Sequence, residues 1–240
     1  MSVGPAGAAP SSEPKALPVT DGVQHRSRGW SGILFALLYF AGLVPLGELL
    51  GSFGDPDATF VAFFDKDSNR VGTLVGGVVL ALGVLSFLWF LSHLRLATME
   101  PGPLPSLVTG AGVTFVALLL VGTASLITVP YSRTFGGAYG DSSILVGSEA
   151  LLPQLGYVLV AVFGMWAFAA VIVAVTVSAR RSGTFPRWLV RVGFASAAFV
   201  SLLGSSVMGL LGVPVWTLCV SIHWLREARM SRRNDRVTST

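Results

Sequence analysis

The sequence predicts an all-α membrane protein, a bundle of six transmembrane helices with both termini in the cytoplasm. Three observations lead to this fold class. Hydrophobic residues make up 52% of the 240 residues and charged residues only 12%, whereas soluble domains carry about twice that charged fraction. Apolar runs long enough to cross about 30 Å of hydrocarbon recur along the chain. The basic residues gather in segments that would lie on one side of the membrane. This composition excludes an ordinary soluble enzyme, a disordered protein and a disulfide-stapled secreted domain.

The chain divides into a tail, a membrane domain and a second tail. Residues 1–29 are rich in Pro, Ala, Ser and Gly and have no apolar period, which predicts a disordered cytoplasmic tail. They do not resemble a signal peptide, because the apolar stretch starts only at Trp30. We expect the transmembrane domain over 30–226 and a basic cytoplasmic tail over 227–240.

Four separate apolar segments predict the first four spans. They cover residues 30–50, 71–94, 106–129 and 153–178. Each has the roughly 20 residues that a membrane-crossing helix needs. Pro153 is acceptable at the start of the fourth span, because the first turn of a helix has no use for that N–H. Ahead of the second span, we expect a polar side chain of the Asp67-Ser68-Asn69 run to cap the helix.

The last apolar region, 188–225, is too long for one span. A helix of about 38 residues would measure about 57 Å, nearly twice the hydrocarbon thickness. The run Gly204-Ser205-Ser206 is its most breakable point. We therefore predict helices over 186–204 and 207–226, joined by a very tight turn. Pro214 should kink the second of them, because it removes a backbone hydrogen bond.

The charge distribution fixes the predicted orientation. Six spans place thirteen of the sixteen basic residues on the side that holds both termini, and leave only Lys66, Arg70 and Arg133 on the other. The positive-inside rule then puts both termini in the cytoplasm of a cell whose plasma membrane the chain spans. The net charge is +4. Because the arginines flank apolar segments, we expect these basic residues to contact membrane lipids and not nucleic acid.

Small residues recur at four-residue spacing in two of the predicted helices. Gly72 and Gly76 form one pair, and Gly193, Ala197 and Ser201 form a row along the fifth helix. A helix face without bulk lets another backbone approach closely. Such faces pack either the monomer itself or a partner, which would be another membrane protein or a second copy of this chain.

Few ionisable groups fall within the predicted spans, and these are the functional candidates. Glu48 lies near the outer end of the first helix. It either faces the outer interface or lines a polar vestibule with Gln154 or Tyr157 of the fourth helix. Such a vestibule would be the outer mouth of a permease or channel for a small solute.

His93 and His223 form a second candidate constellation. Each lies two or three residues before an arginine at the cytoplasmic boundary, on the second and sixth helices. Two imidazoles facing each other across helices can ligate haem iron. Alternatively, each anchors its helix at the interface. Neither a G-x-S-x-G nor an H-E-x-x-H pattern occurs, and the single cysteine, Cys219, reads as a small hydrophobe within an apolar run.

Several segments together carry a resemblance to a known group. These are Phe63-Phe-Asp-Lys-Asp-Ser-Asn-Arg70, Phe87-Leu-Trp-Phe-Leu-Ser-His-Leu-Arg95, Phe185-Pro-Arg-Trp188 and the close from Trp216 to Trp224. The chain resembles uncharacterised six-helix integral membrane proteins of high-GC actinobacteria over most of its length. The resemblance implies six helices and a plasma-membrane location, and it brings no activity or site.

The sequence therefore favours a polytopic membrane protein that is not an enzyme and acts as an accessory or interaction subunit, without a cofactor. A small-solute permease or channel is the alternative. A haem-binding redox membrane protein that uses His93 and His223 is the third possibility.

Overall fold

Every element of the described chain is helical. The computed structural model describes residues 21–51, 62–98, 103–135 and 151–238, and places side chains in 27–46, 62–96, 103–135, 151–206 and 208–230. The helices are α1 (Asp21–Gly51), α3 (Asp67–Thr98), α4 (Pro103–Phe135), α5 (Leu151–Val158), the π-helical segment η3 (Leu159–Gly164), α6 (Met165–Ser182), α7 (Arg187–Leu203) and α8 (Val207–Thr238).

Five helical segments of the described chain are long and apolar enough to cross a membrane. They are Ser27–Leu46, Asp67–Leu96, Pro103–Phe135, Leu151–Ser182 and Met208–Met230. The fourth combines α5, η3 and α6 into one continuous path. The predicted all-α class is therefore confirmed for the described residues, and the length and apolar composition of these five segments suit a multi-pass membrane protein.

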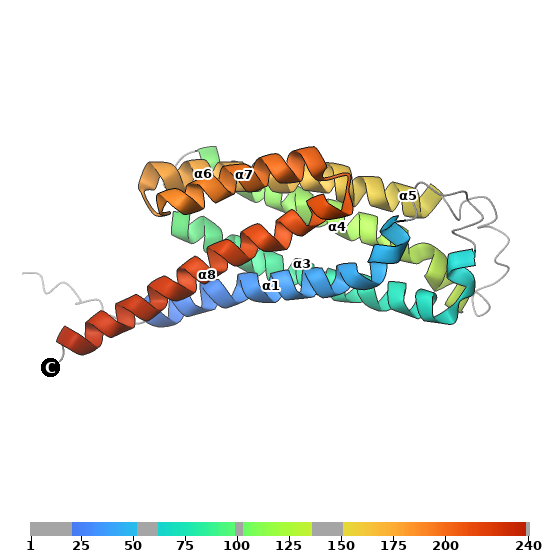
Figure 1. Ribbon diagram of the computed structural model, residues 1–240, viewed down its shortest axis with the longest axis horizontal. Coiled ribbons are helices and arrows are strands. Elements are labelled where there is room, and N and C mark those ends of the chain that lie inside the picture. Colours follow the sequence, from blue (N-terminus) through green and yellow to red (C-terminus); the bar gives the residue numbers. More distant parts are fainter. Residues whose placement is uncertain (1–20, 52–61, 99–102, 136–150, 239–240) are drawn as a thin grey trace, which may run out of the picture.

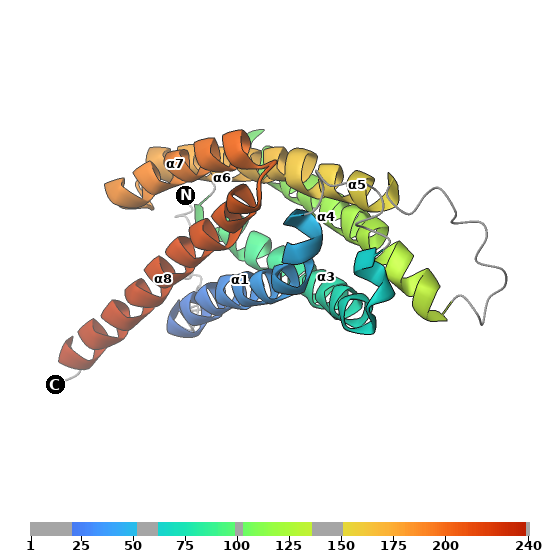
Figure 2. The same ribbon diagram turned by 45° about the vertical axis from the view of Figure 1, so that its right-hand side comes forward.

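The helices close into a ring. α1 packs on α3, α3 on α4, α4 on α5 and α6, α6 on α7, α7 on α8, and α8 returns to α1. Figure 1 shows the chain running back and forth along one axis, with α7 returning beside α6. Figure 2 shows α8 diverging from the α6–α7 pair toward the start of α1. The start of α1, the α6–α7 turn and the end of α8 all lie at the same end of the bundle.

The predicted break between the last two helices lies at the expected place. α7 ends at Leu203 and α8 begins at Val207. The Ser206 N–H and its hydroxyl both donate to the Leu203 carbonyl, at 2.8 and 2.7 Å. Ser206 also accepts the Gly209 N–H at the start of α8. With 17 residues, α7 is about 26 Å long, slightly less than the hydrocarbon thickness.

The two predicted tails are shorter than expected, because the helices that border them continue. α1 begins at Asp21, so the prediction of disorder is wrong for residues 21–29, while 1–20 lie outside the described chain. α8 runs on to Thr238, so most of 227–240 is helical. Gly29 lies directly against Leu225, and a Cβ at Gly29 would be 2.5 Å from its Cγ. The start of α1 is thus supported by α8, and the continuation of α8 begins with the good helix formers Glu227, Ala228 and Met230.

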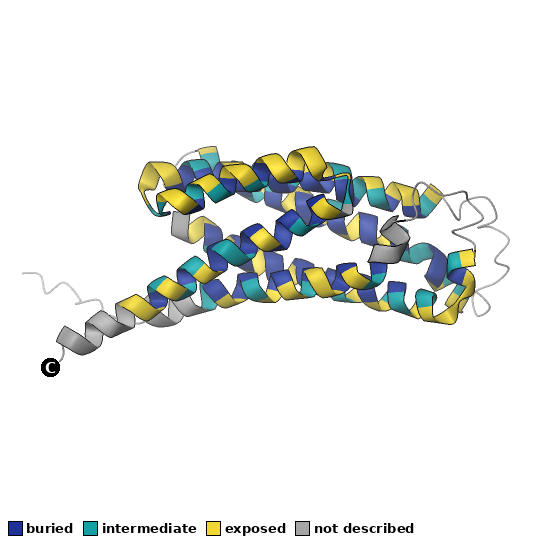
Figure 3. Ribbon diagram, viewed as in Figure 1, coloured by how far each residue is buried: buried dark blue, intermediate teal, exposed yellow. Residues whose placement is uncertain are grey.

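Aromatic rings fill the centre of the ring of helices. Phe87 of α3 lies 4.9 Å from Phe35 of α1, 5.1 Å from Phe115 of α4 and 5.9 Å from Phe168 of α6, measured between ring centroids. Trp216 of α8 completes the set, 5.8 Å from Phe168. All five rings are buried, and Figure 3 shows the buried residues turned inward and the exposed ones outward. Large apolar side chains cover the outside, including Leu37, Leu85, Trp166 and Leu202, as lipid contact requires.

Two reciprocal glycine pairs set the closest helix approaches. A Cβ at either Gly42 of α1 or Gly76 of α3 would lie 2.9 Å from the carbonyl oxygen of the other. Gly122 of α4 and Gly156 of α5 face each other in the same way, with distances of 2.8 and 2.6 Å. In a lipid bilayer the hydrophobic effect does not drive helices together, and van der Waals packing between closely approaching backbones stabilises their association instead.

Candidate functional site

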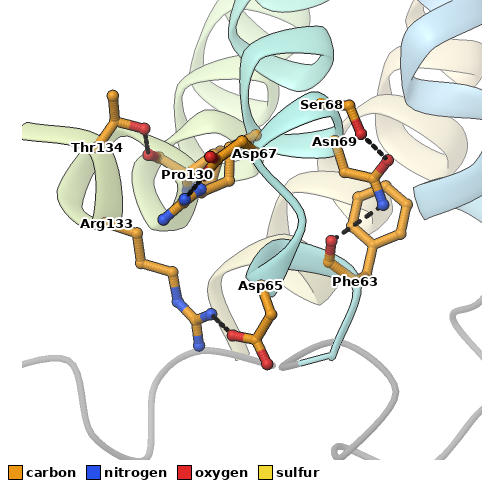
Figure 4. A network of polar contacts seen from close by, with 9 residues as sticks. Phe63, Asp65, Asp67, Ser68, Asn69, Pro130, Arg133 and Thr134 are labelled. Carbon is orange, nitrogen blue, oxygen red and sulfur yellow. Dashed lines mark hydrogen bonds and ion pairs between the residues drawn. The ribbon is translucent and has the colours of Figure 1, made fainter.

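One end of the bundle holds a paired polar network, shown in Figure 4. Arg133, near the end of α4, donates to the Asp65 carboxylate at 2.8 Å, and Arg70 pairs with Asp67. The Asn69 amide donates to the Phe63 carbonyl at 3.0 Å. Nearby, Phe64 is buried against Leu126 and Val129 of α4. Each arginine at this end therefore has a carboxylate partner.

The start of α3 differs from the predicted capping. The Lys66 carbonyl accepts the N–H groups of Asn69 and Arg70 at 3.1 and 3.2 Å. The Asp67 and Asn69 side chains bond Arg70 and the Phe63 carbonyl instead. The Asn69 side chain ties the segment before α3 to the helix, because it bonds the Phe63 carbonyl. A side chain that makes another hydrogen bond or ion pair is not available to cap the backbone N–H groups of the helix.

The three residues of the predicted vestibule have different surroundings. The Tyr157 hydroxyl donates to the Ser205 carbonyl in the α7–α8 turn, whereas Gln154 is exposed. Glu48 lies in α1, but its side chain is outside the described part of the chain. Tyr157 thus gives a donor to a carbonyl of the turn between α7 and α8. A vestibule formed with Glu48 stays a prediction.

The small residues singled out for helix packing divide into two groups. Gly76, Gly193 and Ala197 are buried, with Gly193 directly against Thr176 of α6. Gly72 is looser, since a Cβ there would meet only Pro45, at 3.9 Å. Ser201 is exposed, and the buried row of α7 continues through Val200 and Gly204 instead. A helical turn has 3.6 residues, so each step of four residues moves slightly around the helix. After two such steps, from Gly193 to Ser201, the row has left the buried face.

His93 and His223 have different neighbours. His93 lies 5.8 Å from Trp89 on its own helix, between ring centroids, and neither ring nitrogen has a hydrogen-bond partner among the described residues. His223 meets Phe185 and Trp188 edge-on, at 5.9 and 6.4 Å. Its Nε2 is 3.3 Å from Oε1 of Glu227. His223 therefore faces the start of α7, and joint haem ligation with His93 stays a prediction.

A cavity of about 590 Å³ opens beside the α6–α7 turn, and the sequence did not single it out as a site. Arg180 from the end of α6 and Arg187 and Arg191 from the first turns of α7 line it, with Phe185, Val190 and Phe194 as apolar walls. Gly183, at φ 70°, makes the turn that brings the two helix ends together. The signal was four arginines within twelve positions, interrupted by a glycine and a proline; three of them line the cavity.

No family model, curated protein or solved structure matches this chain. Within the described residues, His, Cys, Asp and Glu side chains form no group of three that could hold a metal ion.

Proposed function

We propose that the protein is a six-pass integral membrane protein of the plasma membrane that does not transport solutes and acts as an accessory or interaction subunit. The observation that carries this proposal is the aromatic core. Rings from α1, α3, α4, α6 and α8 pack along the centre of the helix ring, where a permeation path would run. Buried, mutually packed phenylalanines offer a solute neither water nor polar partners.

The charges at the two ends support the orientation. The end with Asp65 and Asp67 neutralises its arginines. The other end carries Arg95, Arg180, Arg181 and Arg187, which have no ion pair within the described part of the chain. The positive-inside rule counts Lys and Arg residues and gives acidic residues little weight, so the end with more arginines is the cytoplasmic one. With α7 as a sixth, short crossing, both termini would lie there.

Flux through the reconstituted protein tests the proposal. After they shrink in osmotic gradients of small neutral and ionic solutes, vesicles containing the purified protein should re-swell no faster than protein-free vesicles. Matched vesicles with a known channel show that the assay responds. Solute-dependent acceleration that disappears in a pore-blocking variant would overturn the proposal and favour the permease. A Soret band in the purified protein that is lost on His93→Ala would favour the haem protein.

A further inference from the structure

We propose that the arginine-lined cavity beside the α6–α7 turn binds a phosphate group that carries net negative charge. This inference goes beyond the proposed function and does not depend on it. Three arginines, Arg180, Arg187 and Arg191, line one hollow of about 590 Å³. Guanidinium groups offer forked pairs of N–H donors that match the oxygens of a phosphate.

Among the residues that the structure describes, no acidic side chain lines the cavity. No acidic residue occurs in the sequence between 150 and 226, whereas five arginines fall in that stretch. The first carboxylate after it, Glu227 on α8, lies 3.3 Å from the His223 imidazole and does not line the cavity. None of the three arginines forms an ion pair within the described residues. Because no described carboxylate offsets their mutual repulsion, a bound anion would be stabilised among them.

The position of α7 strengthens this imbalance. Arg187 is the first residue of that helix, and Arg191 follows one turn later. The positive end of the helix dipole disfavours cations at such positions and favours anions. The N-cap residue, Pro186, provides no side-chain cap. A bound phosphate would offset both the helix end and the arginines.

The apolar walls favour a phosphate that is attached to a hydrophobic body. Phe185, Val190 and Phe194 line the same cavity as the arginines, and exposed Trp188 stands beside them on α7. Anionic glycerophospholipids combine these two features, a phosphate headgroup and apolar acyl chains. The arginines lie at the ends of apolar helices, where headgroups would meet them in a membrane. Free phosphate would bind the arginines but would leave the apolar walls without a partner.

Native mass spectrometry of the full-length protein, with stepwise addition of phosphatidylglycerol or phosphatidylcholine, tests the site. The variant is R187Q/R191Q. The matched control, R181Q/R229Q, removes the same charge from two exposed arginines that do not line the cavity. Each basic residue near an anionic lipid contributes about fivefold in affinity, so the variant should bind phosphatidylglycerol about 25-fold more weakly, and the control nearly like wild type. The three proteins should bind phosphatidylcholine with similar affinity.

Inorganic phosphate separates the two sources of the group. If a lipid is the ligand, excess phosphate leaves bound phosphatidylglycerol in place. If free phosphate is the ligand, it displaces the lipid, and its ³¹P line broadening by wild-type protein is lost in R187Q/R191Q. Equal binding of both lipid and phosphate by R187Q/R191Q and R181Q/R229Q would overturn the proposal. Should the double variant not fold, R191Q alone is expected to weaken binding about fivefold.

Discussion

Adding one methyl group at Gly122 should loosen the bundle, although the same change elsewhere on α4 should not. A Cβ at Gly122 would lie 2.8 Å from the Gly156 carbonyl oxygen and 2.5 Å from Val160 Cγ2. Gly110 on the same helix has nothing within 4 Å of its Cβ position. Both positions are helical, so both alanines gain the same helix propensity, about 1 kcal/mol. The difference between the variants therefore isolates packing.

The size of the difference follows from the contacts. Overpacking a closely packed site costs about 1–3 kcal/mol when the neighbours must move. At Gly122 one neighbour is backbone, which cannot rotate away as a flexible side chain can. We expect Gly122→Ala to be about 2 kcal/mol less stable than Gly110→Ala, which corresponds to a melting temperature lower by roughly 4–8 °C.

Thermal unfolding in one detergent, followed by circular dichroism and by static light scattering, measures this difference. Gly156→Ala serves as the reciprocal variant, since its Cβ would lie 2.6 Å from the Gly122 carbonyl oxygen. Its melting temperature should fall by about as much as that of Gly122→Ala. If Gly122→Ala melts at or above Gly110→Ala, α4 and α5 do not meet through this glycine pair, and the reasoning fails.

Three further predictions concern single side chains, each measured by melting temperature in detergent. Tyr157→Phe should destabilise the protein by about 1–2 kcal/mol, because the Ser205 carbonyl loses its donor. Tyr39→Phe should stabilise it by about 1 kcal/mol, because the buried Tyr39 hydroxyl has no partner among the described residues. Equal shifts of the melting temperature in one direction would contradict this. Phe87→Ala should cost about 3–5 kcal/mol, and Phe199→Ala, on the exposed face of α7, under about 1 kcal/mol; similar losses would mean that Phe87 is not at the centre of the core. Asp65→Asn should change stability by less than about 1 kcal/mol, with the loss shrinking as salt rises, because the Asp65 side chain is 66% exposed; a large, salt-independent loss would refute a surface ion pair.

The sequence predicts the helices well, because apolar length is a local property. The break at Gly204–Ser206 followed from the length of the last apolar run and from its small polar residues. The start of α1 at Asp21 did not follow, because Gly29 packs on Leu225 of the distant helix α8. By contrast, the helix formers Glu227, Ala228 and Met230 favour a continuation of the last helix by a turn or two, and α8 runs on further, to Thr238. Helix ends that depend on a distant neighbour leave no local pattern.

The candidate sites were harder to predict, because they depend on which face of each helix points inward. Ser201 continued a sequence row but not the buried face of α7. Tyr157 was one of two candidate partners of Glu48 in a vestibule, and its hydroxyl donates to a carbonyl of the α7–α8 turn. Arg180 and Arg191 were read as topology signals, and only the turn at Gly183 brings them to one cavity.

The side of the membrane on which each terminus lies tests the central claim most directly. In a Cys219→Ala background, single cysteines at Ser11, Ser143 and Ser239 can be labelled in intact cells with an impermeant thiol reagent. Six crossings, with α7 as the short one, predict labelling at Ser143 from outside, and labelling at Ser11 and Ser239 only after the membrane is permeabilised. Outside labelling at Ser239 but not at Ser11 would mean that α7 does not cross, and would contradict the six-pass account.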